Sequence, residues 1–190
     1  MSEAVSAVQG ATASGFVDVV EAGLIGMVTI RGDLSDTDFA HAVGSVTHCG
    51  LPEKRGIASG ANDQLLWMST DELLLICAHD EAEARVGALT AALSGQHHLA
   101  VNVSDARAVF RVTGTGSSVR EALAKVTPAE MRPGSLPVGE VRRTRMAQVP
   151  AAIWFDSEDQ ATIVCFRSVG TYIFDLLAQS SKPGSEVGHF

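Results

Sequence analysis

Cysteine is scarce in this chain: its 190 residues include only Cys49, Cys77 and Cys165, which stand far apart and form no CxxC pair. An odd number of widely spaced cysteines favours buried thiols in a reducing compartment over a disulfide framework. No apolar run approaches the roughly 20 residues that span a bilayer. Residues 1–15 also lack the basic start and the apolar stretch of a signal peptide. These absences predict a cytoplasmic location and no membrane partner.

Basic residues are outnumbered: the chain has 14 Lys and Arg against 22 Asp and Glu, a net charge of −8. No nucleic-acid partner is expected, because that affinity comes from neutralising phosphates. The charge is uneven, since residues 107–145 hold eight basic and three acidic residues, a local +5, and the remainder carries −13. This stretch could face an acidic partner or an anionic ligand. It could equally be a solvated arginine face.

One order of elements occurs twice along the chain. The hydrophobic patterns predict, in the first half, strands at 26–32, 65–68, 73–78 and 99–103, with helices at about 36–46 and 80–93. In the second half they predict strands at 108–113, 141–149, 151–155 and 161–167, with helices from about 118 and at 169–179. Ser35 and Asp36 offer N-cap oxygens to the first helix, and Ser118-x-x-Glu121 fits a capping box.

Strands in runs, with helices between them and tight hairpins, predict an α+β fold of two tandem ferredoxin-like modules with mostly antiparallel sheets. The halves resemble an internal duplication, because Trp67 and Trp154 occupy the same place before a hairpin turn. We expect a first module at 16–104, a second at 105–180, and flexible tails at 1–15 and 181–190. The two tryptophans are expected to anchor cores.

Three groups of residues could carry chemistry. The turn at 114–118 is glycine-rich but matches neither GxGxxG nor GxxxxGK[ST], so a serine-capped strand-to-helix turn explains it better than a nucleotide site. The histidines at 41, 48, 97 and 98, with Cys49, show no familiar metal-ligand spacing. Ser104 and Asp105, followed by Arg107, lack the GxSxG elbow of a hydrolase. We therefore expect no catalytic residue, no metal and no cofactor site in this chain.

The basic stretch contains the one set of residues that we assign to a partner interface: Arg132, Arg142, Arg143 and Arg145. Arg143 and Arg145 lie two residues apart on a predicted strand and so share a face, with Arg142 on the other. Arginine is enriched at interfaces and binds carboxylates through paired hydrogen bonds. The alternative is an edge strand that its charges protect from aggregation.

Several segments resemble the γ subunit family of heterotetrameric sarcosine oxidases: 26–34, 66–74, 103–107, 111–114, 123–125, Trp154, 166–168 and Tyr172. They follow one another in order from about residue 20 to residue 180. The chain has Thr127-Pro128 where the family would have Cys-Pro, and Asn102 where an acidic residue is usual. The segment from Val103 to Gly114 is also similar to the aminomethyltransferase family of the glycine cleavage system.

This resemblance implies a complex that oxidatively demethylates sarcosine to glycine, with formation of hydrogen peroxide and of 5,10-methylenetetrahydrofolate or formaldehyde. It implies α, β and δ subunits as partners, which would carry FAD, FMN, NAD and tetrahydrofolate. The chain itself would be structural. Two alternatives remain: a stand-alone folate-binding protein of aminomethyltransferase type, and a small ferredoxin-like regulatory domain.

Overall fold

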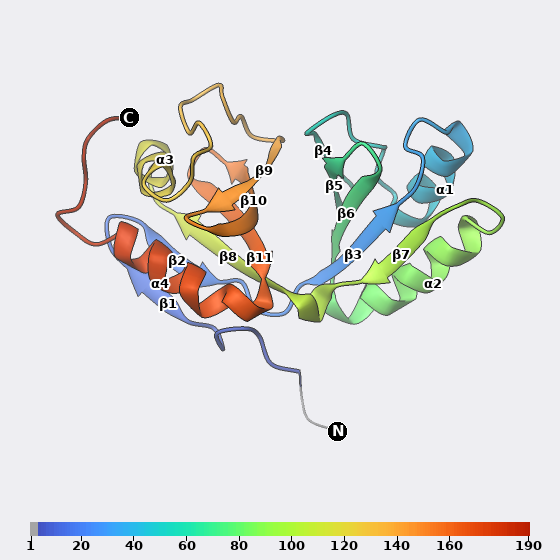
Figure 1. The fold of residues 1–190 in the computed structure, drawn as a ribbon, viewed down its shortest axis with the longest axis horizontal. Helices are drawn as coiled ribbons and strands as arrows, with labels where there is room; N and C mark the ends of the chain where they lie inside the picture. The colour runs from blue at the N-terminus through green and yellow to red at the C-terminus, as the bar shows by residue number, and fades with distance from the viewer. Residues whose placement is uncertain (1–3) are drawn as a thin grey trace. The chain divides into compact units, whose positions relative to one another are not determined.

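This computed structural model describes residues 4–190 of the chain. These residues form two antiparallel sheets, each packed with two helices. They form two units (Figure 1). One unit is Leu24–Ser104, and the other combines Asp105–Phe190 with the described residues up to Gly23. The predicted α+β class with antiparallel sheets is confirmed.

The Leu24–Ser104 unit has a five-stranded sheet in the order β4-β5-β6-β3-β7. Its elements are β3 (Gly26–Arg31), α1 (Thr37–Thr47), β4 (Ile57–Ser59), β5 (Gln64–Ser69), β6 (Glu72–Cys77), α2 (Ala82–Ala92) and β7 (Leu99–Asn102). Asp36 caps α1 as predicted, because its carboxylate accepts the N–H groups of Asp38 and Phe39. Helices α1 and α2 cover one face of the sheet (Figure 1), and the core between them includes Ile30, Leu75 and Leu89.

The second unit has a six-stranded sheet in the order β1-β2-β8-β11-β10-β9. Its elements are β1 (Thr12–Ser14), β2 (Asp18–Glu21), β8 (Arg107–Thr113), α3 (Gly116–Ala124), β9 (Val141–Met146), β10 (Val149–Ser157), β11 (Gln160–Phe166) and α4 (Gly170–Ser180). Phe110, Ile153 and Ile163 of the sheet pack with Leu123 of α3 and Ile173 of α4. Strand β9 pairs only with β10 and is the last strand on its side of the sheet.

Residues 16–23 lie in the second unit, although the sequence assigns them to the first module. Strand β2 pairs with β8, with Asp18 opposite Thr113, and Val17 and Val19 join the core of that unit. Alternating apolar residues show that a segment is a strand, but they do not show which sheet it joins. One partner strand of β2, β1, precedes it, but the other, β8, follows only after the whole Leu24–Ser104 unit.

The segments predicted as flexible tails are tied down in their described parts by two buried carboxylates. Glu21 accepts hydrogen bonds from the Ser6 hydroxyl at 2.7 Å and from the N–H groups of Val8 at 2.9 Å and Gly10 at 2.6 Å. Glu121 accepts the N–H groups of Val187 and Gly188. Residues 1–3 of the predicted N-terminal tail lie outside the described residues.

Two local predictions differ from the structure. Helix α3 begins at Gly116, and its N-cap, Thr115, makes no side-chain cap bond, so the predicted capping box does not form. Glu121 is turned to the C-terminal segment instead. The strand predicted at 141–149 is divided into β9 and β10 by a turn at Ala147, whose φ of 47° lies in the left-handed region.

Candidate binding surfaces

The glycine-rich turn between β8 and α3 is explained by close packing. A Cβ on Gly116 would lie 2.9 Å from the carbonyl oxygen of Glu158, and one on Gly114 would lie 2.8 Å from a methyl group of Val17. Thr115 and Ser118 hydrogen-bond to each other at 2.7 Å through their hydroxyls. The small residues that suggested a phosphate loop therefore have a structural role in this unit.

Ser104, the serine of the candidate hydrolase residues, is held by hydrogen bonds within the Leu24–Ser104 unit. Ser104 is buried, its Oγ accepts the N–H of Met27 at 2.9 Å, and it donates to the Asn102 amide oxygen at 2.6 Å. Asn102 also accepts the N–H of Ser104 at 3.0 Å. Asn102 thus holds Ser104 at the end of β7. The guanidinium of Arg107 lies 4.2 Å from the centre of the Phe166 ring, a cation–π contact.

The histidines and cysteines do not come together as metal ligands. His41 and His48 are exposed, and His48 ends α1 in the left-handed conformation with a φ of 53°. Among the described residues, no group of three His, Cys, Asp or Glu side chains is placed to hold a metal ion. Burial raises the pKa of the Cys77 thiol to about 11 and that of Cys165 to about 12, so both thiols are protonated and poor nucleophiles at neutral pH.

The four arginines assigned to an interface lie on β9 and the loop before it, but they differ in their surroundings. Arg143 and Arg145 are exposed on the same side of β9, opposite Ala152 and Pro150 of β10. Arg142 is half-buried on the other side, where its guanidinium donates to the Ser135 carbonyl oxygen at 2.7 Å. Arg132 is 68% exposed and pairs with Glu130 at 2.6 Å. We call Arg132, Arg142, Arg143 and Arg145 the basic strip.

Arg120, which sequence reasoning did not single out, holds the loop that precedes the basic strip. It is 2% exposed and donates to the carbonyl oxygens of Met131 at 3.1 Å and Leu136 at 3.2 Å. It also pairs with Glu158 at 3.1 Å and lies 4.2 Å from the centre of the Phe155 ring. Its neighbours in α3, Val119, Glu121, Ala122 and Leu123, are all buried, so the apolar pattern around position 120 was the one available signal.

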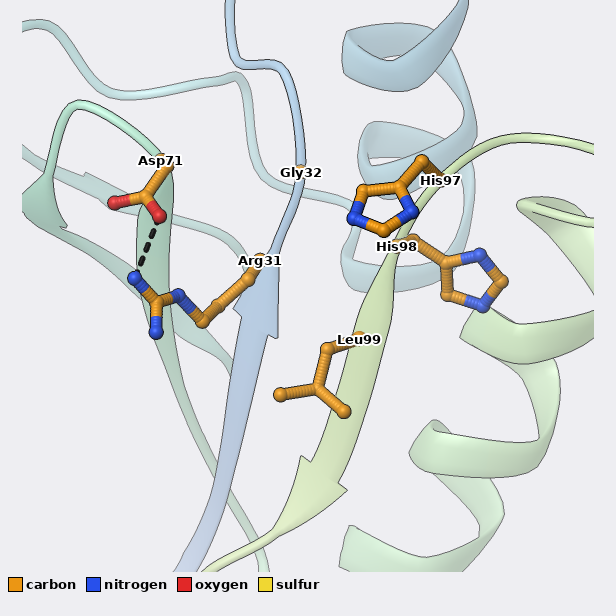
Figure 2. A pocket seen from close by; sticks show the side chains of 6 residues that line it. All are labelled: Arg31, Gly32, Asp71, His97, His98 and Leu99. Atoms are coloured by element: carbon orange, nitrogen blue, oxygen red, sulfur yellow. Dashed lines mark hydrogen bonds and ion pairs between the residues drawn. The ribbon is translucent and has the colours of Figure 1, made fainter.

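A cleft of about 450 Å³ opens in the Leu24–Ser104 unit where β3 ends. It is lined by Arg31, Gly32, Asp71, His97, His98 and Leu99. Arg31 donates to Asp71 at 2.5 Å across the ends of β3 and the β5–β6 turn (Figure 2). Leu99 lies opposite Arg31 in the β3–β7 pairing and is 46% exposed. The imidazole of His98 contacts the Gln96 carbonyl oxygen at 3.0 Å and turns away from the ion pair (Figure 2).

No helix among residues 4–190 has the length and apolar character needed to cross a bilayer.

Comparison with known proteins gives consistent matches over most of the chain. The family described as "Sarcosine oxidase, gamma subunit family" matches residues 31–183. A sarcosine oxidase subunit gamma from Arthrobacter sp. is 29% identical over 154 residues, which are 79% of this chain and 72% of that protein.

Two solved structures share the fold. The heterotetrameric sarcosine oxidase from Corynebacterium sp. U-96, in complex with pyrrole 2-carboxylate, contains a chain with a TM-score of 0.79 and 22% identity, covering 90% of this chain and 87% of that one. The glycine cleavage system aminomethyltransferase T from Bartonella henselae has a TM-score of 0.61 and 14% identity, over 86% of this chain but 45% of that one.

Proposed function

Because the chain belongs to the sarcosine oxidase gamma subunit family, we propose that it acts as the γ subunit of a heterotetrameric sarcosine oxidase and contributes to its assembly. A relative with 72% of its length matched carries the name of this subunit, and a heterotetrameric sarcosine oxidase contains a chain of the same fold. The proposed function is thus that of one part of an oxidoreductase complex.

The proposed complex converts sarcosine to glycine by oxidative demethylation. The methyl carbon leaves as formaldehyde or passes to tetrahydrofolate as the 5,10-methylene derivative, and oxygen is reduced to hydrogen peroxide. Hydride acceptance from an amine requires a bound redox cofactor. We propose that FAD, FMN, NAD and tetrahydrofolate are held by the α, β and δ subunits.

The proposed role in assembly rests mainly on the basic strip. It gathers exposed arginines on β9, the last strand of the six-stranded sheet, in a chain whose net charge is −8. Arg120 holds the adjoining loop from within, so the positions of the strip are set by the core. Arginine forks bind carboxylates with two parallel hydrogen bonds, and charge complementarity of this kind governs encounter rate and specificity. We propose that the strip contacts acidic residues of a partner subunit.

Charge reversal on β9 tests this role. The double variant R143E/R145E should keep its own fold, because exposed charge changes usually alter stability by less than about 0.5 kcal/mol. It should lose most of its co-purification with co-expressed α, β and δ subunits. The matched control is K54E/K182E, which makes the same change in net charge at two exposed lysines that belong neither to β9 nor to the loop before it.

Full recovery of the complex with folded R143E/R145E would show that the strip is solvated surface and that the interface lies elsewhere. If the wild-type chain also fails to co-purify, the assignment as a γ subunit of this complex is wrong.

A folate-binding protein of aminomethyltransferase type is the second candidate, because the fold matches that of an aminomethyltransferase. The match covers 45% of the aminomethyltransferase chain, so most of that chain has no counterpart here. Titration of the purified chain with tetrahydrofolate separates the candidates: stoichiometric binding by the isolated chain favours the second.

A further inference from the structure

The cleft at the end of β3 presents two opposite charges side by side. Arg31 and Asp71 are joined at 2.5 Å, and their side chains are still 48% and 51% exposed. Asp71 engages one of the three guanidinium nitrogens. A guanidinium carries five N–H donors, and a carboxylate has about four lone-pair sites. Each ion can therefore bind a further partner from the cleft without leaving the other.

A small network holds this ion pair in place. The Ser69 hydroxyl donates to the second oxygen of Asp71 at 2.6 Å, and the N–H of Gly32 donates to the Asp71 carbonyl at 3.1 Å. Most exposed ion pairs contribute little to the stability of a protein, because two long side chains lose conformational entropy when they are fixed in one geometry. Here the Ser69 hydroxyl orients the carboxylate of Asp71, and strand pairing with Glu72 and Leu99 holds the backbone of Arg31. Groups that are ordered in advance reduce the entropy cost of binding a ligand.

The arrangement of charges selects the class of ligand. A simple anion drawn to Arg31 would be repelled by Asp71, and a simple cation drawn to Asp71 would be repelled by Arg31. In a molecule that carries both charges, each repulsion is offset by the attraction of its other charge. The exposed Leu99 side chain lies on the strand beside Arg31 (Figure 2) and offers an apolar contact. His97, also on the rim, has ring nitrogens that can bond to a carboxylate.

We propose that this cleft binds a small zwitterionic amino acid, with its carboxylate on Arg31, its ammonium group on Asp71 and an apolar side chain against Leu99. The volume of about 450 Å³ lies within the range of small-molecule sites. This binding site is separate from the proposed assembly role of the basic strip and does not depend on it.

Three ligands of similar shape test the proposal on the purified full chain. L-leucine carries both charges, 4-methylpentanoate lacks the ammonium group, and 3-methylbutylamine lacks the carboxylate. We expect leucine to shift the backbone amide NMR signals of Gly32, Asp71 and Leu99, with a dissociation constant of about 1 mM. The two ligands of single charge should bind at least roughly tenfold more weakly.

Substitutions in the ion pair separate the two contacts. D71N should weaken leucine binding by roughly tenfold and strengthen 4-methylpentanoate binding, because the repulsion of the carboxylate is removed. R31M should weaken binding of both acids. K182M is the control, since Lys182 is also an exposed basic residue but lies in the other unit and outside the basic strip. It should leave leucine binding unchanged, and thermal melting should confirm that each variant is folded.

Three results would overturn the proposal. If leucine causes no shift at about 50 mM, or if all three ligands bind alike, the pair is an ordinary surface ion pair. If folded D71N weakens leucine and 4-methylpentanoate equally, Asp71 does not contact the ammonium group.

Discussion

The buried guanidinium of Arg120 holds the loop between α3 and β9. Two of its nitrogens bind carbonyl oxygens and a carboxylate, and the face of its guanidinium lies on Phe155. The carbonyl groups of Met131 and Leu136 belong to a segment without regular secondary structure, so they have few other donors. The residue therefore links α3, the loop and the β10–β11 hairpin.

Replacing Arg120 by methionine should lower the free energy of unfolding by roughly 2–4 kcal/mol, because the buried carbonyl groups lose their donor. Urea denaturation of the purified chain measures this. R132M, which removes an exposed arginine from the same loop, should change stability by less than about 0.5 kcal/mol. Equal losses in the two variants would contradict the anchoring role of Arg120.

The structural role of Arg120 could not be predicted from the sequence. The spacing of Val119, Ala122 and Leu123 predicts the helix and its apolar face, but an arginine within that face has no pattern of its own. Its partners, Met131, Leu136 and Glu158, lie in a loop and a turn whose paths depend on tertiary packing. By contrast, the two sides of β9 followed from the period of two alone, and exposure of Arg143 and Arg145 agrees with it.

Among the elements, β2 shows how a carboxylate can stabilise a segment that has little core of its own. Burial of Glu21 acts to raise its pKa, but hydrogen bonds from Ser6, Gly10 and Val8 outweigh it and hold the pKa below the ordinary 4.5. The unfolded chain therefore takes up a proton at higher pH than the folded chain does. The resulting stabilisation is present above pH 4.5 and is lost as the pH falls through the lower folded pKa.

The variant E21Q should accordingly be less stable than the wild type at neutral pH, and the difference should shrink as the pH is lowered below 4.5. Urea midpoints of both proteins between neutral pH and pH 3 give the comparison. An E21Q deficit that stays constant over this range would mean that the charge of Glu21 does not contribute. D18N is the control, since Asp18 is exposed on the same strand.

The elements themselves were predictable to different degrees. Strands β3, β5, β6, β8 and β11 follow from short, largely apolar runs, and β3 and β11 are buried on both faces. Helices α1 and α4 follow from apolar residues that recur on one face. The short strands β1 and β4, of three residues each, give too few positions for a period to be seen. The turn at Ala147 was missed because alanine rarely adopts a positive φ, so the sequence carries no turn signal there. The cleft was missed because its residues come from separate elements.

Over the whole molecule, the separation of charge gives the proposed assembly a dependence on salt. Residues 107–145 carry +5 in a chain of net charge −8. An acidic partner is therefore attracted by this basic stretch and repelled by the remaining, acidic part of the chain. Raising the ionic strength from about 0.1 M to 1 M shortens the Debye length from about 10 Å to 3 Å. Association of the wild-type chain with its partner subunits should slow.

Association of the R143E/R145E variant should instead become faster as salt is added, because salt then screens a repulsion between the variant and the acidic partner. Association rates from surface plasmon resonance at several salt concentrations test both expectations. The same salt dependence in the two proteins would place the charged contact outside β9.

The discontinuous second unit has a consequence for the order in which the chain acquires structure during synthesis. Domains generally fold as they emerge from the ribosome, N-terminal parts first. Strand β2 leaves the ribosome early, but its partner β8 comes after Ser104. The Leu24–Ser104 unit can therefore fold while β2 has only β1 to pair with and Val17 and Val19 still lack the core around β8. A strand made early is thus among the last to enter its sheet, and during this interval its unpaired edge and apolar side chains are open to aggregation.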